Sequence, residues 1–485
     1  ARDLIKLYAA RRDEKGFAFS PDSPWQKEFE EAFDYEETDD QLRAIAEIKA
    51  DMERSTPMDR LLCGDVGYGK TEVALRAVMK CVLDGKQAAI LVPTTVLAQQ
   101  HYATAINRFR SFPVTIEVLS RFKTPAQKKK ILQSAAEGKI DLLIGTHALI
   151  EDAVRFMRLG VAVIDEQHRF GVAQRARMWR KGEVAPHVLV MTATPIPRTL
   201  AMTVYGDLDV SVIDELPPGR KPIDTRLRYE DNRNEVYHLV QHELNAGRQV
   251  YVVYPLVKEN QKLDLKSVEE GWQRLCGIFQ GWKVGMVHGQ MKPEAKDLQM
   301  ERFVRNETQI LVATTVIEVG VNVPNASVML IENAERFGLS QLHQLRGRVG
   351  RGADHSYCVL MTKRNIGGDT RKRLEVMTAT TDGFLVSEAD MKMRGPGDME
   401  GTQQSGVAWT LNVANLATDG QILNIAREAA DRILNGRPEL VTAPAADRDR
   451  PLQSESILIS DASLAMLQSE LRYRFARSVD WSLIS

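Results

Sequence analysis

The sequence predicts an α/β protein with two similar lobes, each built on a parallel sheet, followed by a mostly helical region. From Met58 onward, short β-branched runs alternate with helical patterns, which is typical of βαβ units. This pattern occurs twice along the chain. Only the first copy carries a glycine-rich loop, "GDVGYGKT", from Gly64 to Thr71. Two lobes with one such loop predict that a nucleotide binds at the cleft between them.

Three strand-like runs of the first copy have counterparts, in the same order, in the second. The runs of the first copy are "QAAILVPTT" (87–95), "IDLLIGTHA" (140–148) and "VAVIDEQ" (161–167). Those of the second copy are "QVYVVYPL" (249–256), "TQILVATTV" (308–316) and "SVMLIENA" (327–334). The third run contains Asp165-Glu166 in the first copy and Glu332-Asn333 in the second. The two lobes therefore differ in their chemistry at an equivalent strand end.

Composition and motifs divide the chain into five regions. "DELPPGRKPID" (214–224) has the proline and glycine density of a connector, and "PELVTAPAADRDRP" (438–451) has the composition of a polar linker. We expect a linker and helical lead-in at 1–38, a first lobe at 39–216, a second lobe at 217–364, a helical region at 365–437, and a linker with a C-terminal tail at 438–485.

The bulk composition limits the class of protein. With 64 Lys and Arg against 65 Asp and Glu, the net charge is -1, so a polyanionic partner would have to meet a local basic face. The four cysteines form no CxxC pair, which argues against a zinc site or a disulfide framework and favours a reducing cytoplasm. No apolar run reaches the ~18 residues of a membrane span. Because the chain begins at Ala, we expect upstream domains to be missing.

The glycine-rich loop has the spacing of a phosphate-binding loop. A buried strand is predicted over 60–63 and a helix over 70–83, closed by Gly85. Glycines in such a loop let backbone N–H groups approach phosphates at a helix N-terminus. Lys70 would then reach the β and γ phosphates, and Thr71 would bind Mg²⁺. The loop glycines are Gly64, Gly67 and Gly69.

An acidic pair follows the third strand of the first lobe. Ligands of parallel sheets bind at the carboxyl ends of the strands, where Asp165 and Glu166 are expected. An Asp-Glu pair at a strand end is often only a solvated loop. With a phosphate-binding loop in the same lobe, however, we expect Asp165 to hold Mg²⁺ through water and Glu166 to orient and deprotonate the attacking water.

An arginine-rich segment, "QLHQLRGRVGRG" (341–352), closes the second lobe. Alone, a cluster such as Arg346, Arg348 and Arg351 is usually a solvated or anion-binding patch. A lobe with a phosphate-binding loop that faces a second lobe without one, however, lacks the cation that stabilises charge on the transferring phosphoryl group. We therefore expect Arg348 and Arg351 to be arginine fingers that enter the site when the lobes close. Hydrolysis would then be linked to lobe motion.

The order of motifs resembles that of superfamily 2 helicases and translocases. The motifs are "GDVGYGKT", "VPTTVLAQQH", "GTHALI", "DEQHRFG", "MTATPIPRTL", "VHGQMKP", "ATTVIEVGVNVPNA" and "QLHQLRGRVGRG". The resemblance implies two RecA-like lobes that hydrolyse ATP with Mg²⁺. Within the superfamily, residues 3–132 are similar to Mfd, the transcription-repair coupling factor, and residues 140–435 to RecG. The chain would come from a lineage between these double-stranded DNA translocases or from a fusion of them.

The resemblance also implies roles for residues that pattern alone leaves open. Thr38 and Gln41 form a T-x-x-Q capping box, and the resemblance adds adenine recognition by Gln41, with Phe33 or Tyr35 lying over the base. Asn322 stands where the superfamily usually has an Asp that contacts the ribose or couples the lobes, so hydrolysis would be weakened. Residues expected to couple hydrolysis to movement are Thr192, Thr194, Arg198 and Gln344 in the motor and Arg394, Gln403 and Gln404 in "DGFLVSEADMKMRGPGDMEGTQQSG" (382–406). Without the resemblance, that last segment would be only a glycine-rich loop between charged helices.

DNA would cross both lobes and be gripped through its phosphates, without sequence readout. The candidate contacts are Thr94, Thr95, Gln99, Arg121, Thr146 and His147 in the first lobe and His288, Gln290, Thr314 and Thr315 in the second. The lysine run 128–130 is better explained as a solvated helix face. Aromatic residues are 6% of the chain and do not alternate with basic ones, which disfavours a single-strand stacking platform and favours duplex DNA.

We therefore predict an ATP-driven DNA translocase of bacterial DNA repair and recombination, working in the cytoplasm at the nucleoid. Its partner would be double-stranded or branched DNA if it remodels forks or migrates branches as RecG does. It would be RNA polymerase, through modules absent from this chain, if it displaces a stalled polymerase as Mfd does. A nucleotide-dependent DNA clamp that recruits partners is the alternative, favoured by Asn322. An RNA helicase is disfavoured by "DEQH" and by residues 382–406.

Overall fold

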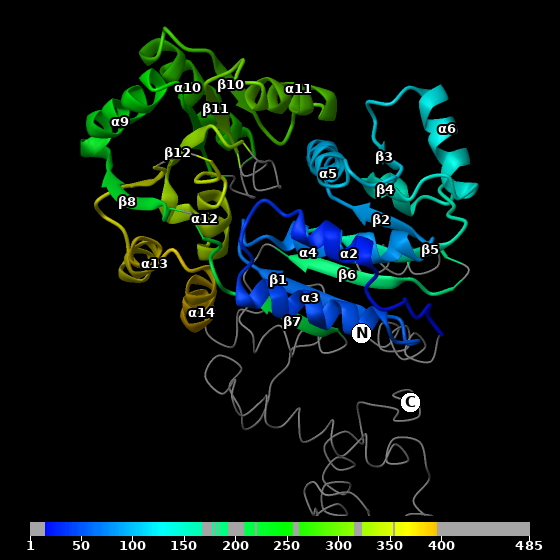
Figure 1. The fold of residues 1–485 in the computed structure, drawn as a ribbon. Helices are drawn as coiled ribbons and strands as arrows, with labels where there is room; N and C mark the ends of the chain where they lie inside the picture. Colours follow the sequence, from blue (N-terminus) through cyan, green and yellow to red (C-terminus); the bar gives the residue numbers. More distant parts are fainter. Residues whose placement is uncertain are drawn as a thin grey trace, which may run out of the picture. The chain divides into compact units, whose positions relative to one another are not determined.

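Two parallel sheets organise the protein (Figure 1). The computed structural model describes residues 15–166, 177–178, 181–182, 184–192, 208–218, 221–255, 261–314, 323–352 and 355–394. We call the first sheet with its helices lobe 1 and the second sheet with its helices lobe 2. The predicted α/β fold with two tandem parallel-sheet lobes is confirmed.

Lobe 1 is built on a seven-stranded sheet in which every pairing is parallel. Its strands are β1 (Asp59–Gly64), β2 (Gln87–Leu91), β3 (Ile116–Leu119), β4 (Leu142–Gly145), β5 (Leu159–Ile164), β6 (His187–Thr192) and β7 (Asp209–Ile213), in the order β3-β4-β2-β5-β6-β1-β7. Its helices are α2 (Pro24–Glu31), α3 (Asp39–Met52), α4 (Lys70–Leu83), α5 (Thr95–Arg108), α6 (Pro125–Ala136) and the short η1 (His147–Ile150).

Lobe 2 is built on a six-stranded sheet that is also parallel throughout. Its strands are β8 (Asp224–Tyr229), β9 (Gln249–Val253), β10 (Val284–Val287), β11 (Ile310–Ala313), β12 (Ala326–Ile331) and β13 (Tyr357–Thr362), in the order β10-β11-β9-β12-β13-β8. Its helical elements are η3 (Glu230–Asn232), α9 (Arg233–Asn245), α10 (Gln261–Ile278), α11 (Pro293–Val304), η5 (Ala334–Arg336) and α12 (Leu339–Arg346). The helices α13 (Gly368–Ala379) and α14 (Gly383–Arg394) follow β13.

The two sheets repeat one strand order, as the duplicated sequence pattern predicts. The order β3-β4-β2-β5-β6-β1 of lobe 1 matches β10-β11-β9-β12-β13-β8 of lobe 2, and lobe 1 adds β7 at one edge. The three predicted strand pairs are therefore equivalent: β2 with β9, β4 with β11, and β5 with β12. All six predicted runs extend past the last residue of their strand, and β5 and β12 begin earlier than predicted.

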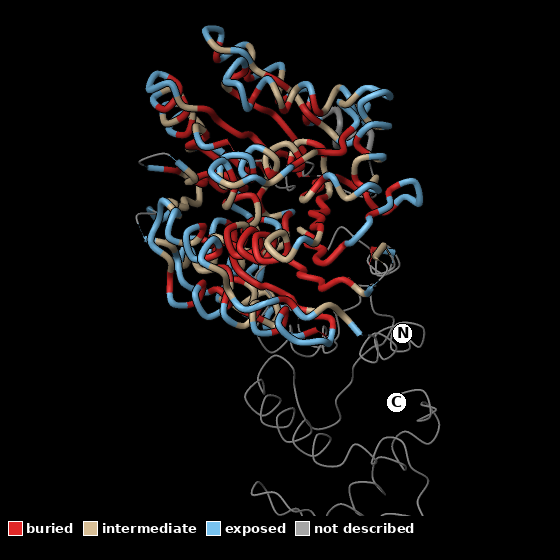
Figure 2. Tube along the Cα trace, turned by 45° about the vertical axis from the view of Figure 1, so that its right-hand side comes forward, coloured by how far each residue is buried: buried red, intermediate tan, exposed pale blue. Residues whose placement is uncertain are grey.

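The strands form because their sequences are almost continuously apolar and can be buried on both faces. All residues of β5, β6 and β12 are buried, and buried segments run through both lobes in Figure 2. Parallel sheets covered by helices on both faces require this kind of strand. Because all strands of a lobe point the same way, their carboxyl ends meet along one edge, where loops and helix N-termini collect polar groups.

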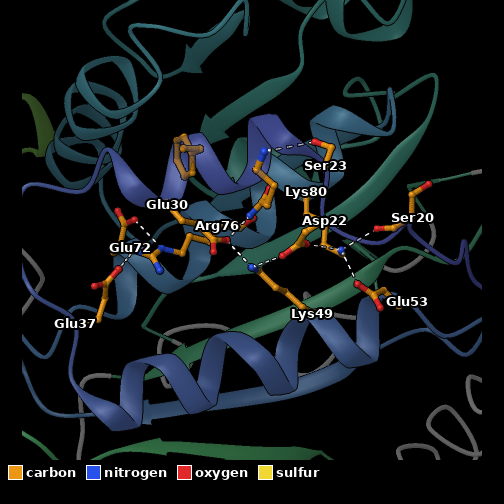
Figure 3. Close-up of polar contacts among 12 residues, drawn as sticks. Ser20, Asp22, Ser23, Glu30, Glu37, Lys49, Glu53, Glu72, Arg76 and Lys80 are labelled. Atoms are coloured by element: carbon orange, nitrogen blue, oxygen red, sulfur yellow. Dashed lines mark hydrogen bonds and ion pairs between the residues drawn. The ribbon is translucent and has the colours of Figure 1, made fainter.

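Residues before α3 pack into lobe 1. Phe19 and Phe29 are buried in the same apolar core as α4. The helix α4 carries Arg76 and Lys80, whose charged groups turn toward this lead-in segment (Figure 3). Lys80 Nζ donates to Asp22 Oδ1 at 2.8 Å and to Glu53 Oε1 at 2.7 Å.

Arg76 is the second anchor of the lead-in segment, and its side chain is 2% exposed. Its Nε donates to Glu72 Oε1 at 2.9 Å, and its guanidinium also pairs with Glu37. Its backbone carbonyl accepts from Gln26 Nε2 at 3.2 Å. Because Gln26 lies in α2 and Glu37 follows it, Arg76 attaches the lead-in segment to the helix that begins at Lys70.

Two further features complete the description. None of the helices in the described part is long and apolar enough to cross a membrane. All four cysteines are free thiols, and Cys63, Cys81 and Cys358 are buried. Burial raises the pKa of the Cys63 thiol to about 12, so it stays protonated at neutral pH.

Candidate nucleotide site and nucleic-acid face

The predicted phosphate-binding loop joins β1 to α4 at the carboxyl edge of the lobe 1 sheet. Gly69 precedes the first helical residue and has φ +81, a left-handed conformation that favours glycine. A Cβ at Gly69 would also overlap the side-chain amide of Gln41. The helix spans Lys70–Leu83 as predicted and ends before Gly85, whose φ is +68. Both ends of α4 are thus fixed by glycines.

Lys70 lies inside this loop and is buried. Its Nζ donates to the carbonyls of Gly64 and Asp65, each at 2.7 Å. Burial lowers the pKa of Lys70, while the charges of Glu166 and Asp165 act in the opposite direction. A lysine between carboxylates and backbone carbonyls can exchange these partners for phosphate oxygens.

The acidic pair lies directly after β5. The backbone N–H of Asp165 donates to the carbonyl of Leu91 at 2.9 Å, and the N–H of Glu166 donates to Asp165 Oδ1 at 2.9 Å. Glu166 has φ +54, a left-handed conformation that is uncommon for a residue with a side chain. The chain therefore turns sharply here, and both carboxylates lie within electrostatic range of Lys70.

His101 is part of this site although the sequence reasoning assigned it no role. Its Nε2 lies 2.9 Å from Asp165 Oδ2. Because an ionised carboxylate only accepts hydrogen bonds, Nε2 carries the hydrogen. Burial alone would raise the pKa of the Asp165 carboxyl, but the hydrogen bond and charge of His101, together with Lys70, lower it below its usual value. The only available signal was its place at the end of "VPTTVLAQQH".

The donor set at this edge fits Mg²⁺ bound together with nucleotide phosphates. Thr71 and Asp165 offer a hydroxyl and a carboxylate, which are the hard oxygen ligands that Mg²⁺ prefers. Within the described ranges, no group of three or more His, Cys, Asp or Glu side chains could hold a metal ion. Mg²⁺ often relies on one or two carboxylates plus substrate phosphates rather than on a protein cage.

The three residues predicted to contact adenine, Gln41, Phe33 and Tyr35, have different neighbours and different exposure. Gln41 forms the predicted capping box with Thr38, which is confirmed, and its Nε2 donates to the carbonyl of Tyr68 in the phosphate-binding loop at 2.8 Å. The guanidinium carbon of Arg76 lies 5.5 Å from the centre of the Phe33 ring. Tyr35 is 73% exposed. Adenine recognition by these residues stays a prediction.

The arginine-rich segment of lobe 2 lies against the phosphate-binding loop of lobe 1. A Cβ on Gly347 would lie 3.0 Å from Cβ of Val66, so the two backbones approach closely. Arg351 Nε donates to the carbonyl of Gly347 at 3.1 Å, and its charge contributes to the lowered pKa of Lys70. Arg348 is buried. The charge of Arg351 thus acts in the same direction as burial on the pKa of Lys70, and the finger role of both arginines stays a prediction.

A buried chain of hydrogen bonds joins the two lobes at the same place, and the sequence reasoning did not anticipate it. His343 Nε2 lies 2.7 Å from Asp65 Oδ1, and His343 Nδ1 lies 2.8 Å from Arg346 Nη2. Because arginine only donates, Nδ1 accepts and Nε2–H donates, so His343 is neutral. Arg346 Nη1 then donates to the carbonyls of Met377 and Thr380 at 2.8 and 2.7 Å. These hydrogen bonds connect the phosphate-binding loop with the end of α13.

Several predicted DNA contacts of lobe 1 meet at one cavity. The cavity has a volume of about 530 Å³, and its lining includes Thr94, Thr95, Arg121, Thr146 and His147. Lobe 2 contributes residues of α11, and Arg121 Nε donates to Asp297 Oδ2 of that helix at 2.8 Å.

The other predicted contacts do not line this cavity. Gln99 donates from Nε2 to Ser120 Oγ at 3.4 Å, and Ser120 is itself a lining residue. His288, Gln290 and Thr314 lie elsewhere in lobe 2: Gln290 is exposed, while Thr314 is buried at the end of β11.

The predicted coupling residues are only partly within the structure. Thr192 is buried at the end of β6, and Gln344 is half-buried on α12. The backbone of Arg394 ends α14, but its side chain is not described. The predicted residues outside the described ranges are Thr194, Arg198, Thr315, Asn322, Gln403 and Gln404.

Family models match three parts of the chain. The DEAD/DEAH box helicase model matches residues 38–203, and the helicase conserved C-terminal domain matches residues 232–353. A model described as ATP-dependent DNA helicase RecG, domain 3, C-terminal, matches residues 380–447. The first of these models lies over lobe 1 and the second over lobe 2.

Curated relatives are similar over most of the chain. The ATP-dependent DNA helicase RecG of Synechocystis sp. is 46% identical over 91% of the chain and 53% of its own length. That of Aquifex aeolicus is 48% identical over 90% of the chain and 56% of its own length. Matches of this extent include most of residues 3–132, so the similarity to RecG extends into the part predicted to resemble Mfd. The Mfd resemblance has no support from these relatives.

Solved structures agree with this similarity. A structure of RecG bound to a three-way DNA junction has a TM-score of 0.73 and 42% identity, covering 87% of this chain and 55% of that chain. A DNA-bound DUF1998 helicase MrfA, at a TM-score of 0.54 and 16% identity over 76% of this chain and 56% of that chain, is similar in fold alone. The chain spans about half the length of the relatives that it matches.

Proposed function

We propose that this chain is the ATP-driven motor of a double-stranded DNA translocase of the RecG kind. The observation that carries the proposal is the contact of His343 and Gly347 in lobe 2 with Asp65 and Val66 in the phosphate-binding loop. A nucleotide bound in that loop would touch both lobes. Hydrolysis could therefore change the relation between the lobes, as a motor requires.

The residues of the site suit phosphoryl transfer to water. Lys70 would leave the carbonyls of Gly64 and Asp65 to bind phosphate oxygens, while Thr71 and Asp165 would hold Mg²⁺. When bound, Mg²⁺ neutralises charge on the β and γ phosphates. Glu166, held in its turn after β5, would orient the attacking water and accept its proton.

Two arginines would complete the site from lobe 2. We infer that Arg351, and with it Arg348, stabilises the charge that develops on the transferring phosphoryl group. The electrostatic contribution of Arg351 at Lys70 supports this role. A ribose contact of Asn322 and adenine contacts of Gln41, Phe33 and Tyr35 remain proposals of the same kind.

Movement on DNA would follow from a grip formed by both lobes. The cavity lined by Thr94, Thr95 and Arg121 also includes α11 of lobe 2, so a change between the lobes alters its two walls. Hydroxyls and a few cations contact phosphates without reading bases. Such a grip can be released in every cycle.

Branched DNA is the substrate that we propose. The similar RecG structure is bound to a three-way DNA junction, which supports this choice. Such a motor would act at the nucleoid in a bacterial cytoplasm. Displacement of a stalled RNA polymerase, as by Mfd, is the alternative role, and it would need modules beyond the motor.

Coupling of hydrolysis to movement is proposed for the region after β13. Arg346 joins the end of α13 to His343 and thus to the phosphate-binding loop, which supports a link between this region and the nucleotide. We expect Arg394→Ala to retain DNA-stimulated hydrolysis but to stop movement. A parallel fall of hydrolysis and movement would count against a coupling role. Gln403, Gln404, Thr192, Thr194, Arg198 and Gln344 are proposed to act in the same coupling.

The test is steady-state ATP hydrolysis with linear duplex DNA, a three-way junction, single-stranded DNA or duplex RNA, alongside displacement of a triplex-forming strand. Stimulation by duplex DNA with displacement, absent in Lys70→Ala, is the expected result. DNA binding without stimulated turnover would favour the clamp. Stimulation by RNA alone would favour an RNA helicase, and displacement of a stalled transcription complex would favour the Mfd-like role.

A further inference from the structure

One helix of lobe 1, α5, contacts both the proposed DNA cavity and the proposed metal carboxylate. Thr94 precedes its first residue, and the Thr94 side chain accepts from the N–H of Leu97 at 3.3 Å. Thr94 and Thr95 line the cavity. His101 lies two turns further along the helix, and Arg108 two turns beyond that. Residues seven apart lie on nearly the same helix face.

His101 is the contact of α5 with the nucleotide site. Its side chain is 6% exposed, and its Nε2–H donates to Asp165 Oδ2 at 2.9 Å. The other carboxylate oxygen, Oδ1, accepts from the N–H of Glu166 at 2.9 Å. These two hydrogen bonds fix the plane of the Asp165 carboxylate. Removing His101 would leave Oδ2 without this donor and free the carboxylate to rotate.

Arg108 attaches the other end of α5 to α4. Its Nε donates to Glu72 Oε2 at 3.0 Å and its Nη2 to Glu72 Oε1 at 2.9 Å, a bidentate pair. The Arg108 guanidinium also lies 3.9 Å from the centre of the Phe29 ring. Because α4 begins at Lys70, this end of α5 keeps a fixed relation to the phosphate-binding loop, whereas its first turn faces the cavity.

We propose that His101 is a positioning residue for Asp165, and that α5 transmits occupation of the DNA cavity to this carboxylate. The inference rests on the proposed function for the identity of the ligand in the cavity. A phosphate bound at Thr94, Thr95 and Arg121 would displace the first turns of α5, and His101 would carry that displacement to Oδ2 of Asp165. DNA would thereby set the geometry in which Mg²⁺ and its water are held.

A purely structural role for His101 predicts something different. In that case its replacement would lower the melting temperature, but the folded protein would bind magnesium and nucleotide as before. A positioning role predicts a weaker response to Mg²⁺ even when the protein is fully folded. Outer hydrogen-bond partners of metal ligands typically contribute a factor of about 10–100 in metal affinity or activity.

The experiment compares four variants in the full chain. His101→Leu removes the donor, His101→Asn keeps an amide that is too short to reach Asp165, and His101→Gln places an amide N–H close to the position of Nε2. Thr104→Ala, at an exposed position of the same helix, is the matched control. If the leucine variant does not fold, the asparagine and glutamine pair carries the comparison. Thermal melting identifies the folded variants.

Two quantities are measured on each folded variant. The first is the Mg²⁺ concentration at half-maximal binding of a fluorescent ATP analogue without DNA, and the second is the ratio of DNA-stimulated to basal hydrolysis at saturating Mg²⁺. We expect the leucine and asparagine variants to need about tenfold more Mg²⁺ and to lose most of the stimulation. Glutamine should recover much of both, and Thr104→Ala should match the wild type.

The inference fails if folded leucine or asparagine variants keep the wild-type Mg²⁺ requirement and stimulation, or if glutamine is as damaging as leucine. Failure of the proposed function is a separate result, because wild-type protein would then show no stimulation by duplex DNA. The Mg²⁺ comparison contains no DNA, so it still tests the role of His101 at Asp165.

Discussion

The same strand end carries an acidic pair near Lys70 in lobe 1 and an acid bound by Arg233 in lobe 2. After β5 the chain continues with Asp165 and Glu166, and after β12 with Glu332 and Asn333. Glu166 has φ +54 and Asn333 has φ +49, so the backbone turns in the same way. The N–H of Asp165 donates to Leu91, the last residue of β2, and the N–H of Glu332 donates to Val253, the last residue of β9. The backbone of the site is duplicated.

The lobes differ in the cationic side chain near these carboxylates and in what it binds. In lobe 1, Lys70 begins α4 and donates to carbonyls of the glycine-rich loop. In lobe 2, Arg233 begins α9 and binds Glu332 through Nη1 at 2.6 Å and Nη2 at 2.9 Å. The hydrogen bond with Glu332 is also the main reason that the pKa of Arg233 is raised. The acid of lobe 2 is paired with an arginine of its own lobe, whereas Asp165 in lobe 1 accepts a hydrogen bond from His101.

The two lobes differ most in the segment that leads from the first strand into the helix carrying the cation. In lobe 1 the glycine-rich loop lies between β1 and the helix that begins at Lys70. In lobe 2, η3 leads from β8 directly into α9, and Arg233 reaches the carboxylate itself. Under the proposed function, lobe 2 would act on a nucleotide held by lobe 1 through its arginine-rich segment rather than through a site of its own.

The largest expected effect is the loss of ATP hydrolysis when Lys70 of lobe 1 is replaced. Lys70→Ala should abolish detectable ATP hydrolysis because the phosphates lose their main side-chain cation. Glu166→Gln should also abolish turnover but retain ATP binding, since the amide is isosteric and only the base is lost. Phosphate release and binding of a fluorescent ATP analogue measure these effects. Normal hydrolysis in the glutamine variant would remove Glu166 from its role.

The next effect concerns the arginine that lobe 2 contributes. Arg351→Ala should lower kcat by about 10³-fold, which is the lower end of the range for arginine fingers, while nucleotide affinity changes much less. Arg336→Ala, in η5 of the same lobe, serves as the control for loss of a positive charge. Single-turnover hydrolysis separates the chemical step from binding. A comparable loss in both variants would indicate a general charge effect.

A smaller effect is expected for the ion pair of lobe 2, and it should appear in stability rather than in chemistry. Arg233→Ala leaves Glu332, whose side chain is 4% exposed, without its guanidinium. Breaking a buried pair from one side costs about 3–5 kcal/mol in the free energy of unfolding. Arg233→Ala together with Glu332→Gln should recover part of this loss. Urea unfolding measures it, and a loss of hydrolysis without a loss of stability would contradict the structural role.

The smallest effect is expected for the contact between the lobes. His343→Leu removes the donor to the buried carboxylate of Asp65, which still accepts from the N–H of Val66. Loss of one partner of a buried group costs about 1–3 kcal/mol. Because the contact joins the lobes, we assign this cost to the arrangement that hydrolyses ATP, which corresponds to a fall in DNA-stimulated kcat of roughly 10- to 100-fold. His343→Gln, which keeps a donor, should be affected less. Equal DNA-stimulated rates in both variants and the wild type would show that this contact does not link DNA binding to hydrolysis.

The fold could be predicted closely because local rules fix it. The helix beginning at Lys70 is set by glycines at both of its ends, and the strand runs are apolar throughout. The runs were predicted too long at their carboxyl ends: in the run of β2, Val92 and the threonines that follow extend the β-like pattern past Leu91, whereas the runs of β5 and β12 were carried on into the polar residues after the strand. Apolarity marks burial, but it does not mark where pairing stops.

The partners within the site could not be predicted in the same way. His101 meets Asp165 across 64 residues of sequence, and His343 meets Asp65 across 278. Arg233 meets Glu332 across 99 residues. No local pattern encodes such pairs, because they depend on which strand ends become neighbours when the sheets form. The sequence identified the arginines of 341–352 by type, but not the histidine that contacts the phosphate-binding loop.

The asymmetry of the lobes can be tested most directly by counting nucleotides. Equilibrium dialysis with a non-hydrolysable ATP analogue and Mg²⁺ would be performed on the wild type, Lys70→Ala and Arg233→Ala. We predict one nucleotide per chain in the wild type and in Arg233→Ala, and greatly weakened binding in Lys70→Ala. Two nucleotides per chain, or binding that depends on Arg233 in a folded protein and survives loss of Lys70, would contradict a single site in lobe 1.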